Sequence, residues 1–267
     1  MKIIVITGAT SGLGKELVKV FSKAGYKVFA GYRNEHLIVQ MDNVEYFYID
    51  MTKRATISAA ANFIKSKVNK IDLLINAAGS VVAGPVEYLD IDKLKEQFEV
   101  NTFSHLEFSQ NLLSLLDGGR IINISSMSSF GHFPFISPYC ASKRALDIFF
   151  NALLLETHKN IKVISVKPGV ILTPIWKKSV ESNINALSNC IEYEKELEFL
   201  KNNALSNTSK GLPVNKAAEL IKHISELKNP KVSYTLGKDA KFAQILSLLP
   251  QDLINELVRF GMKLRIK

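Results

Sequence analysis

The stretch that decides the fold is IIVITGATSGLG, residues 3–14. Its first four side chains are apolar and mostly β-branched, which is typical of a buried strand. Three glycines follow at positions 8, 12 and 14, and a helical pattern begins among them. A glycine turn between a strand and a helix lets the backbone approach a pyrophosphate, which the free N–H groups of the helix N-terminus then bind. The stretch predicts a dinucleotide site formed by Gly8, Thr10, Ser11, Gly12, Leu13 and Gly14.

The alternation of strand and helix continues along the chain. Apolar, β-branched runs predict strands at 3–7, 27–32, 45–49, 71–76, 120–125, 162–167 and 232–236. Helical patterns lie between them, near 13–24, 54–68, 90–116, 138–157 and 215–228. We therefore expect an α/β fold: a single Rossmann-type, doubly wound parallel sheet of about seven strands with helices on both faces, formed by residues 1–267 as one domain.

Two stretches lie outside this alternation. Residues 172–214 separate the sixth strand from the next helix, and we expect a substrate lid there because long insertions at this edge of a sheet commonly bind ligands. Residues 240–267 are expected to form a helical tail with an apolar stripe that includes Leu253, Leu257 and Phe260. A docked terminal helix and a membrane-surface helix both have such a stripe. We expect the docked helix and no membrane-surface contact.

Composition excludes several classes of protein. The net charge is +9, from 34 basic and 25 acidic residues, but the basic residues are spread along the chain, so no nucleic-acid partner is expected. The two cysteines, Cys140 and Cys190, have no metal-binding spacing and predict reduced thiols and no metal site. The first apolar run is too short for a signal peptide, and no segment could span a bilayer. We expect a cytoplasmic protein.

Further motifs follow the glycine turn in order. Asn76-Ala77-Ala78-Gly79 ends the fourth strand, Asn101 lies in a helical stretch, Ser126 ends the fifth strand, YCASK spans 139–143, and Pro168-Gly169 precedes Thr173. With the GxxxGxG spacing, this series resembles the short-chain dehydrogenase/reductase family over about residues 1–175, although Ala77 replaces the family's second asparagine. Residues 84–87, 139–143 and the tail from Tyr234 look most like the branch with 17-beta-hydroxysteroid and retinol dehydrogenases.

The resemblance implies an NAD(P)-dependent oxidoreductase and a role for each matching residue. Tyr139 would be the general acid/base, and Lys143 would bind the nicotinamide ribose and lower the tyrosine pKa. Ser126 would orient the substrate, and Asn101 would hold a water in a proton relay. The resemblance also implies cofactor contacts from Asp50, Met51, Asn76, Ala77, Gly79, Tyr139, Lys143, Pro168, Gly169 and Thr173.

The residues themselves are consistent with these roles. Ser137 is a good N-cap and Pro138 a good first helical residue, so Tyr139 is expected in the first turn of a helix. Lys143, four residues on, lies on the same face. A free tyrosine has a pKa near 10, and a nearby ammonium and a helix N-terminus both favour the phenolate. A Tyr-x-x-x-Lys pair alone is usually a surface feature, but the ordered set of motifs makes that interpretation improbable here.

The end of the second strand indicates which cofactor is used. It reads Ala30-Gly31-Tyr32-Arg33, without the acidic residue that holds the ribose hydroxyl of NAD. The Arg33 guanidinium suits the additional phosphate of NADP. A basic residue just before the second motif glycine, the family's other NADP signal, is absent because Ser11 stands there. The sequence predicts NADP(H), with NAD as the alternative.

Aromatic residues give the evidence on the substrate. Phe130, Phe133 and Phe135 lie between Ser126 and Tyr139, and Trp176 follows Thr173. These rings either line an apolar pocket or belong to a core or an interface, and the sequence favours neither interpretation over the other. The pocket interpretation predicts a small hydrophobic alcohol or carbonyl substrate. Two alternatives remain: a 3-oxoacyl thioester reductase of fatty-acid synthesis, and a non-catalytic NADP-binding sensor.

The helix that starts near Tyr139 also predicts self-association. It is apolar almost all round, so one face can cover the sheet while another meets a second subunit. The family resemblance implies pairing through the helices that carry Asn101 and Lys143. We expect a homodimer or homotetramer.

Overall fold

The structure is a computed structural model that describes residues 1–175, 179, 183 and 191–266. Its centre is a seven-stranded parallel sheet, which confirms the predicted fold class. The strand order is β3-β2-β1-β4-β5-β6-β7, with the two halves of the doubly wound fold meeting between β1 and β4. The strands are β1 (Ile3–Ile6), β2 (Lys27–Tyr32), β3 (Val44–Tyr48), β4 (Leu73–Asn76), β5 (Arg120–Ile124), β6 (Lys162–Pro168) and β7 (Ser233–Leu236).

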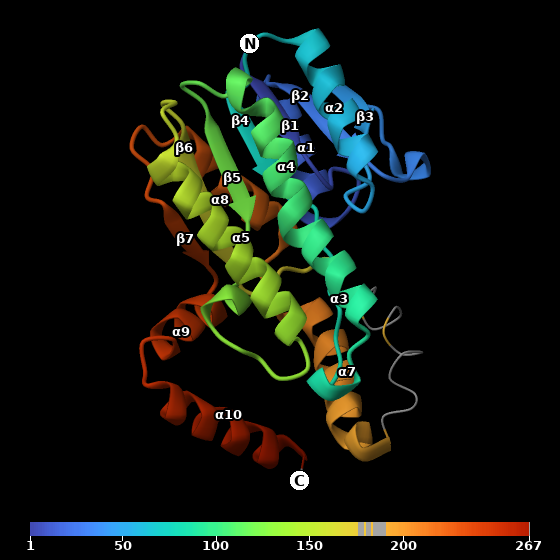
Figure 1. Ribbon diagram of the computed structural model, residues 1–267, viewed down its shortest axis with the longest axis vertical. Helices are drawn as coiled ribbons and strands as arrows, with labels where there is room; N and C mark the ends of the chain where they lie inside the picture. Colours follow the sequence, from blue (N-terminus) through green and yellow to red (C-terminus); the bar gives the residue numbers. More distant parts are fainter. Residues whose placement is uncertain (176–178, 180–182, 184–190, 267) are drawn as a thin grey trace.

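Helices cover both faces of this sheet (Figure 1). Helices α1 (Gly12–Lys23) and α8 (Val214–Glu226) pack on one face, against Ile4 and Ile6 of β1. Helices α2 (Arg54–Lys67), α4 (Ser104–Leu112) and α5 (Ser137–Glu156) pack on the other face, against Val5. Successive strand side chains point to opposite faces, so every central strand contributes to two separate hydrophobic cores.

The predicted helix at 90–116 is interrupted. Helix α3 (Ile91–Phe98) is followed by a π-helical turn, Glu99–Phe103, then by α4 and a short 3₁₀ turn. The wider turn lets Asn101 and Thr102 both face inward. Asn101 donates to the Ser142 hydroxyl at 3.0 Å, and Thr102 donates to the Ser142 carbonyl at 2.9 Å. The helical stretch predicted near 90–116 is therefore present, and what the sequence did not show is its π-helical turn, whose Asn101 and Thr102 side chains bond to α5.

Three helices gather beyond the carboxyl ends of the strands (Figure 1). They are α7 (Glu194–Lys210), α9 (Lys238–Leu246) and α10 (Gln251–Ile266). Asn255 of α10 lies 2.8 Å from the His132 ring, in the loop before α5. The apolar residues Leu253, Leu257 and Phe260 of α10 stay exposed, whereas Ile254 and Val258 are half-buried. Within the described residues, every helix is too short or too polar to cross a membrane.

Candidate active site

The glycine turn joins β1 to α1 with the geometry expected of a phosphate site. Gly8 has a φ of +64°, and a Cβ there would lie 2.8 Å from the Ala78 backbone, so only glycine fits. Helix α1 begins at Gly12 after the N-cap residue Ser11. The Ser11 side chain makes no capping hydrogen bond among the described residues, and the first turn contains no acidic residue. The first N–H groups of α1 are thus left for an anion.

The segment after β6 meets this turn. A Cβ on Gly12 would lie 3.4 Å from the Cβ of Thr173, so Thr173 lies over the start of α1. Pro168 ends β6, and the Gly169 N–H donates to the Leu236 carbonyl of β7 at 2.8 Å. Thr10 is half-buried and Leu13 is buried beside them. The predicted cofactor residues at 8–14 and 168–173 therefore come together at one edge of the sheet.

The NAAG segment lies against the same turn. The Thr7 hydroxyl accepts hydrogen bonds from the backbone N–H groups of Ala77 and Ala78, at 3.0 and 3.3 Å. The Asn76 side chain instead donates to Ser109 of α4 and to Asn123 of β5. Asn76 is therefore used inside the fold, where it ties β4 to its neighbours. Thr7 was not singled out in the sequence, since a threonine at the end of a strand is not distinctive there.

The four predicted catalytic residues lie together near the carboxyl end of β5. Tyr139 forms a side-chain hydrogen bond with Ser126, and both are buried. The Lys143 ammonium lies 5.9 Å from the centre of the Tyr139 ring and donates to the Ile124 carbonyl at 2.8 Å. A Cβ on Gly79 would lie 3.4 Å from Asn101 Oδ1 and 3.5 Å from Lys143 Nζ, so Gly79 lies directly beside both polar groups. Its predicted contact with the cofactor stays a prediction.

Asn101 organises the site from the π-helical turn. Its Oδ1 accepts from the Ser80 N–H at 2.8 Å, and its Nδ2 donates to the Ser80 carbonyl and the Ser142 hydroxyl, each at 3.0 Å. The Ser142 hydroxyl in turn donates to the Tyr139 carbonyl at 2.9 Å. The Asn101 side chain thus fixes the loop after Gly79 to the helix that carries Tyr139. Its predicted role in a water relay stays a prediction.

Burial sets the protonation states of Tyr139 and Lys143. It raises the pKa of Tyr139 to about 12, and the hydrogen bond from Ser126 opposes this only in part. Burial also lowers the pKa of Lys143 to about 8, while the Asp147 carboxylate acts in the opposite direction. Desolvation of the phenolate therefore dominates the pKa of Tyr139, and the predicted lowering by Lys143 stays a prediction. Tyr139 is therefore a phenol at neutral pH.

The helix start also differs slightly from the prediction. Helix α5 begins at Ser137, with Ile136 as the N-cap residue and Pro138 in the first turn. Ser137 is thus inside the helix and is not its cap. Tyr139 remains in the first turn and Lys143 remains one turn further, so the relative placement of the pair is unchanged.

The adenosine end of the predicted site lies at β2 and β3. Arg33 directly follows β2, is exposed, and makes no ion pair with any described residue. Tyr32 is half-buried, with its ring centre 5.8 Å from that of Tyr48. The buried Asp50 carboxylate accepts from the N–H and hydroxyl of Thr52 at 3.0 and 2.8 Å. Met51 is buried next to it.

The aromatic residues of the 130–135 loop have different surroundings. Phe130 is half-buried, and the Lys167 ammonium lies 4.5 Å from its ring centre. Phe133 is half-buried, whereas Phe135 is buried with a φ of +65°. The Phe135 ring centre lies 5.8 Å from that of Tyr193, which lies within the predicted lid and directly before α7. Trp176 and Cys190 lie outside the described residues.

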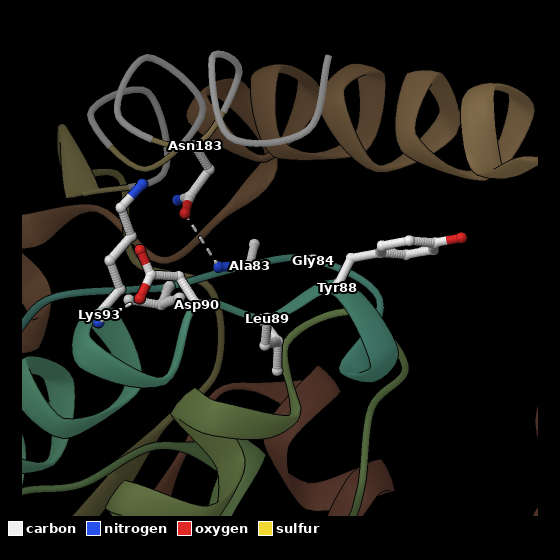
Figure 2. Close-up of a pocket in the computed structure, with 8 residues that line it drawn as sticks. Ala83, Gly84, Tyr88, Leu89, Asp90, Lys93 and Asn183 are labelled. Atoms are coloured by element: carbon white, nitrogen blue, oxygen red, sulfur yellow. Dashed lines mark hydrogen bonds between the residues drawn. The ribbon is translucent and has the colours of Figure 1, made fainter. Parts of the chain in front are cut away.

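A cavity of about 250 Å³ lies beside the loop that follows Ser80. Figure 2 shows Asn183, from the predicted lid, above this loop, where its Oδ1 accepts from the Ala83 N–H at 3.3 Å. The Gly84 N–H donates to the Phe135 carbonyl at 2.7 Å, which joins the loop to the aromatic segment. None of the four predicted catalytic residues lines this cavity. Its lining is Val82, Ala83, Gly84, Tyr88, Leu89, Asp90, Lys93 and Asn183.

Two titratable residues near Tyr139 and Lys143 were not predicted from the sequence. His105 of α4 is fully buried, with Nε2 3.0 Å from the Ala78 carbonyl, and burial lowers its pKa to about 3. Asp147 lies one turn beyond Lys143, within an apolar stretch of α5. The spacing of four residues was a usable signal for Asp147. Nothing in the sequence marked His105, whose neighbours are brought together only by the fold.

Known proteins with similar sequence define the class of this site. Residues 2–184 match the family model described as short chain dehydrogenase. The chain belongs to the short-chain dehydrogenase/reductase family. It is 32% identical to the probable short-chain type dehydrogenase/reductase VdlC of Helicobacter pylori, over 96% of each chain. It is 29% identical to the NADPH-dependent 3-dehydrocapnine reductase of Ornithobacterium rhinotracheale, also over 96% of each. The protein is thus an NAD(P)-dependent short-chain dehydrogenase/reductase.

The solved structures support the same fold. A short-chain dehydrogenase from Streptomyces avermitilis superposes with a TM-score of 0.79 at 23% identity, over 99% of this chain and 97% of that one. The predicted branch within the family is not established. One distant relative, retinol dehydrogenase 7 of Rattus norvegicus, is 29% identical over 97% of this chain and 88% of its own length.

Proposed function

We propose that this family member is an NADP(H)-dependent oxidoreductase that interconverts a hydrophobic alcohol and its ketone or aldehyde. The observation that carries this proposal is the buried Tyr139 phenol, hydrogen-bonded to Ser126 and next to the Lys143 ammonium. These groups lie at the carboxyl edge of the sheet, where ligands bind in open α/β folds. The bound cofactor supplies or accepts the hydride.

The chain's own residues handle the oxygen and the proton. In the reductive direction, Ser126 holds the carbonyl oxygen, and the Tyr139 hydroxyl donates a proton to it as negative charge develops. The phenol is protonated before reaction, since the pKa of Tyr139 lies well above neutral pH. Lys143 holds the nicotinamide ribose and stabilises the phenolate that remains. In the oxidative direction the proton returns to Tyr139.

The preference for NADP(H) rests on the end of β2. Arg33 is exposed and free of any ion pair with a described residue, so its guanidinium is available for the additional phosphate. Tyr32 stands where a carboxylate would repel that phosphate. The name of the 3-dehydrocapnine reductase states NADPH dependence, which agrees with this preference. Ser11 in place of a basic residue predicts moderate discrimination.

The preference for an apolar substrate rests on the aromatic residues of the segment before Tyr139. Phe133 and Phe135 lie in this segment, and Tyr193 packs edge-on against both Phe135 and Tyr88. Aromatic side chains that line a binding site favour bulky apolar groups over small polar ones. The relationship to a retinol dehydrogenase supports the same class of substrate.

Self-association is the remaining part of the proposal. Helix α5 buries Leu146 and Phe150 in the core but exposes Ile148 and Phe149 on its other face. Phe103, in the π-helical turn before α4, is exposed too. Exposed large apolar side chains on neighbouring helices mark a candidate subunit interface. We infer a homodimer or homotetramer formed through these helices.

A substrate panel tests the proposed reaction. The purified protein is given NADPH with ketones and aldehydes from acetone-sized to steroid- and retinal-sized, and loss of NADPH absorbance is followed. We expect higher kcat/KM on the bulky apolar compounds. Equal efficiency across sizes would contradict the apolar site. Strong preference for 3-oxoacyl thioesters would assign the protein to fatty-acid synthesis, and binding without turnover would favour a sensor.

A further inference from the structure

A buried ion pair lies behind the lysine of the site. Asp147 follows Lys143 by one turn of α5, and its Oδ2 lies 2.9 Å from the Nζ of Lys167, near the end of β6. The Asp147 side chain is 1% exposed and that of Lys167 is 8% exposed. Burial of two charges is unfavourable unless good geometry or a third group compensates for it. The ion pair alone is therefore weak evidence for a stabilising role.

The contact with Lys167 does not prevent the Asp147 carboxylate from interacting with a second cation. Neither of its carboxylate oxygens receives a hydrogen bond from any described residue, although Lys167 is at ion-pair distance. Lys167 is held on its other side by the Phe130 ring, whose centre is 4.5 Å from Nζ. The carboxylate can thus act on a second cation, and Lys143 is the one placed on the same face of α5.

The charged and titratable groups around Lys143 come from three elements. Tyr139, Cys140 and Asp147 belong to α5, Lys167 to β6 and His105 to α4. Tyr139 and His105 are neutral at neutral pH, since burial raises the pKa of the first and lowers that of the second. Burial also raises the pKa of the Cys140 thiol. Asp147 is therefore the only anion in this set, and it faces two cations.

We propose that Asp147 is a positioning residue whose negative charge keeps Lys143 in its ammonium form beside Tyr139. Lys167, which pairs with the same carboxylate, weakens this effect. The proposal deepens the proposed function, because it makes turnover depend on a charge held behind Lys143. The titration of Lys143 can be measured without any substrate, so this inference can be tested separately from the proposed reaction.

Two substitutions should shift the pH profile in opposite directions. Lys143 is an ammonium below its pKa of about 8, so turnover should fall as the pH rises through that value. Asp147→Asn removes the anion, and the alkaline limb should move to lower pH by about one unit or more. Lys167→Met removes the competing cation, and the limb should move to higher pH. A residue needed only for folding would lower turnover at every pH and leave the limb in place.

A direct titration separates this inference from the proposed reaction. In cofactor-free protein labelled with ¹³C and ¹⁵N lysine, NMR follows the Lys143 side chain against pH, with Lys143→Arg giving the assignment. The titration of Lys143 should move to lower pH in Asp147→Asn and to higher pH in Lys167→Met, even if no substrate in the panel reacts. Asp147→Glu and Lys167→Arg keep both charges and should titrate close to wild type.

A double variant keeps the proposal testable if either single variant folds poorly. Asp147→Asn with Lys167→Met leaves no unpaired member of the ion pair, and replacement of a buried pair by neutral groups is often tolerated. Its Lys143 titration should lie between those expected of the single variants. A Lys143 titration that stays at the wild-type pH in every variant would overturn the proposal.

Discussion

At the scale of single residues, burial decides how the site is charged. Tyr139 and Lys143 are both buried, and each is moved toward its neutral form, so the phenol is protonated and the ammonium titrates near pH 8. This arrangement suits proton donation to a carbonyl oxygen that is becoming an alkoxide. Arg33 differs, because it stays in water and is free to meet a phosphate.

Arg33→Ala tests the cofactor assignment at this scale. Loss of one charge-assisted contact should weaken NADPH binding by roughly 10- to 100-fold and leave NADH binding nearly unchanged. Fluorescence titration of both cofactors measures the difference. Arg259→Ala, which removes an exposed arginine of α10, is the matched control and should change neither affinity. If wild type binds NADH at least as tightly as NADPH, the role given to Arg33 is wrong.

The sequence predicts a set of site residues that the structure brings together, but it does not predict how burial affects their ionisation. Tyr139, Lys143, Ser126 and Asn101 form ordered motifs, and the structure brings all four together. Sequence spacing shows the lysine near Tyr139 but not the desolvation around both residues, which raises the pKa of Tyr139 and lowers that of Lys143. The Asp147–Lys167 contact joins α5 to β6 across the fold, which no local pattern encodes.

At the scale of elements, the glycine turn and the π-helical turn do most to place the site. The first was predicted, because its glycines have a distinctive spacing. The second was missed, because the stretch from 90 to 116 has an ordinary helical pattern. Its interruption depends on bonds from Asn101 and Thr102 to Ser142, which lies some forty residues away in the chain.

Gly14→Ala tests how closely the first turn is packed. A Cβ at this position would lie 2.2 Å from the Gly8 carbonyl oxygen, which is backbone and cannot move without disturbing the turn. Overpacking of this kind should lower the free energy of unfolding by about 1–3 kcal/mol. Gly131→Ala is the control, since a Cβ there meets no atom within 4 Å. Urea denaturation compares the two; equal stability would show that the turn adapts.

At the scale of the whole molecule, the sheet separates two tasks. Both hydrophobic cores lie along the strands, while the turn after β1, the segment after β4 and the start of α5 lie at the carboxyl edge of the sheet. Helices α7, α9 and α10 lie beyond the same edge (Figure 1). This division was predictable, since parallel strands with crossover helices leave ligand sites at that edge. The exposure of the apolar stripe on α10 was not, because an amphipathic pattern does not show what covers it.

Ile148→Glu tests the proposed assembly. Ile148 is 55% exposed on α5, so a carboxylate there is tolerated in a monomer but is costly in an apolar interface. We expect sedimentation velocity to show a wild-type oligomer and a smaller species for the variant. Leu220→Glu changes a comparably exposed leucine of α8, 43% exposed, and should not alter the assembly. A monomeric wild-type protein would refute this interface.

The most direct test of the central claim is the rate of hydride transfer in Tyr139→Phe. This change removes the hydroxyl that Ser126 contacts and keeps the ring. Single-turnover oxidation of NADPH with the best carbonyl substrate should slow by about 100-fold or more, the usual contribution of a general acid, while NADPH affinity stays close to wild type. A variant that transfers hydride at the wild-type rate would contradict the assignment of Tyr139 as proton donor.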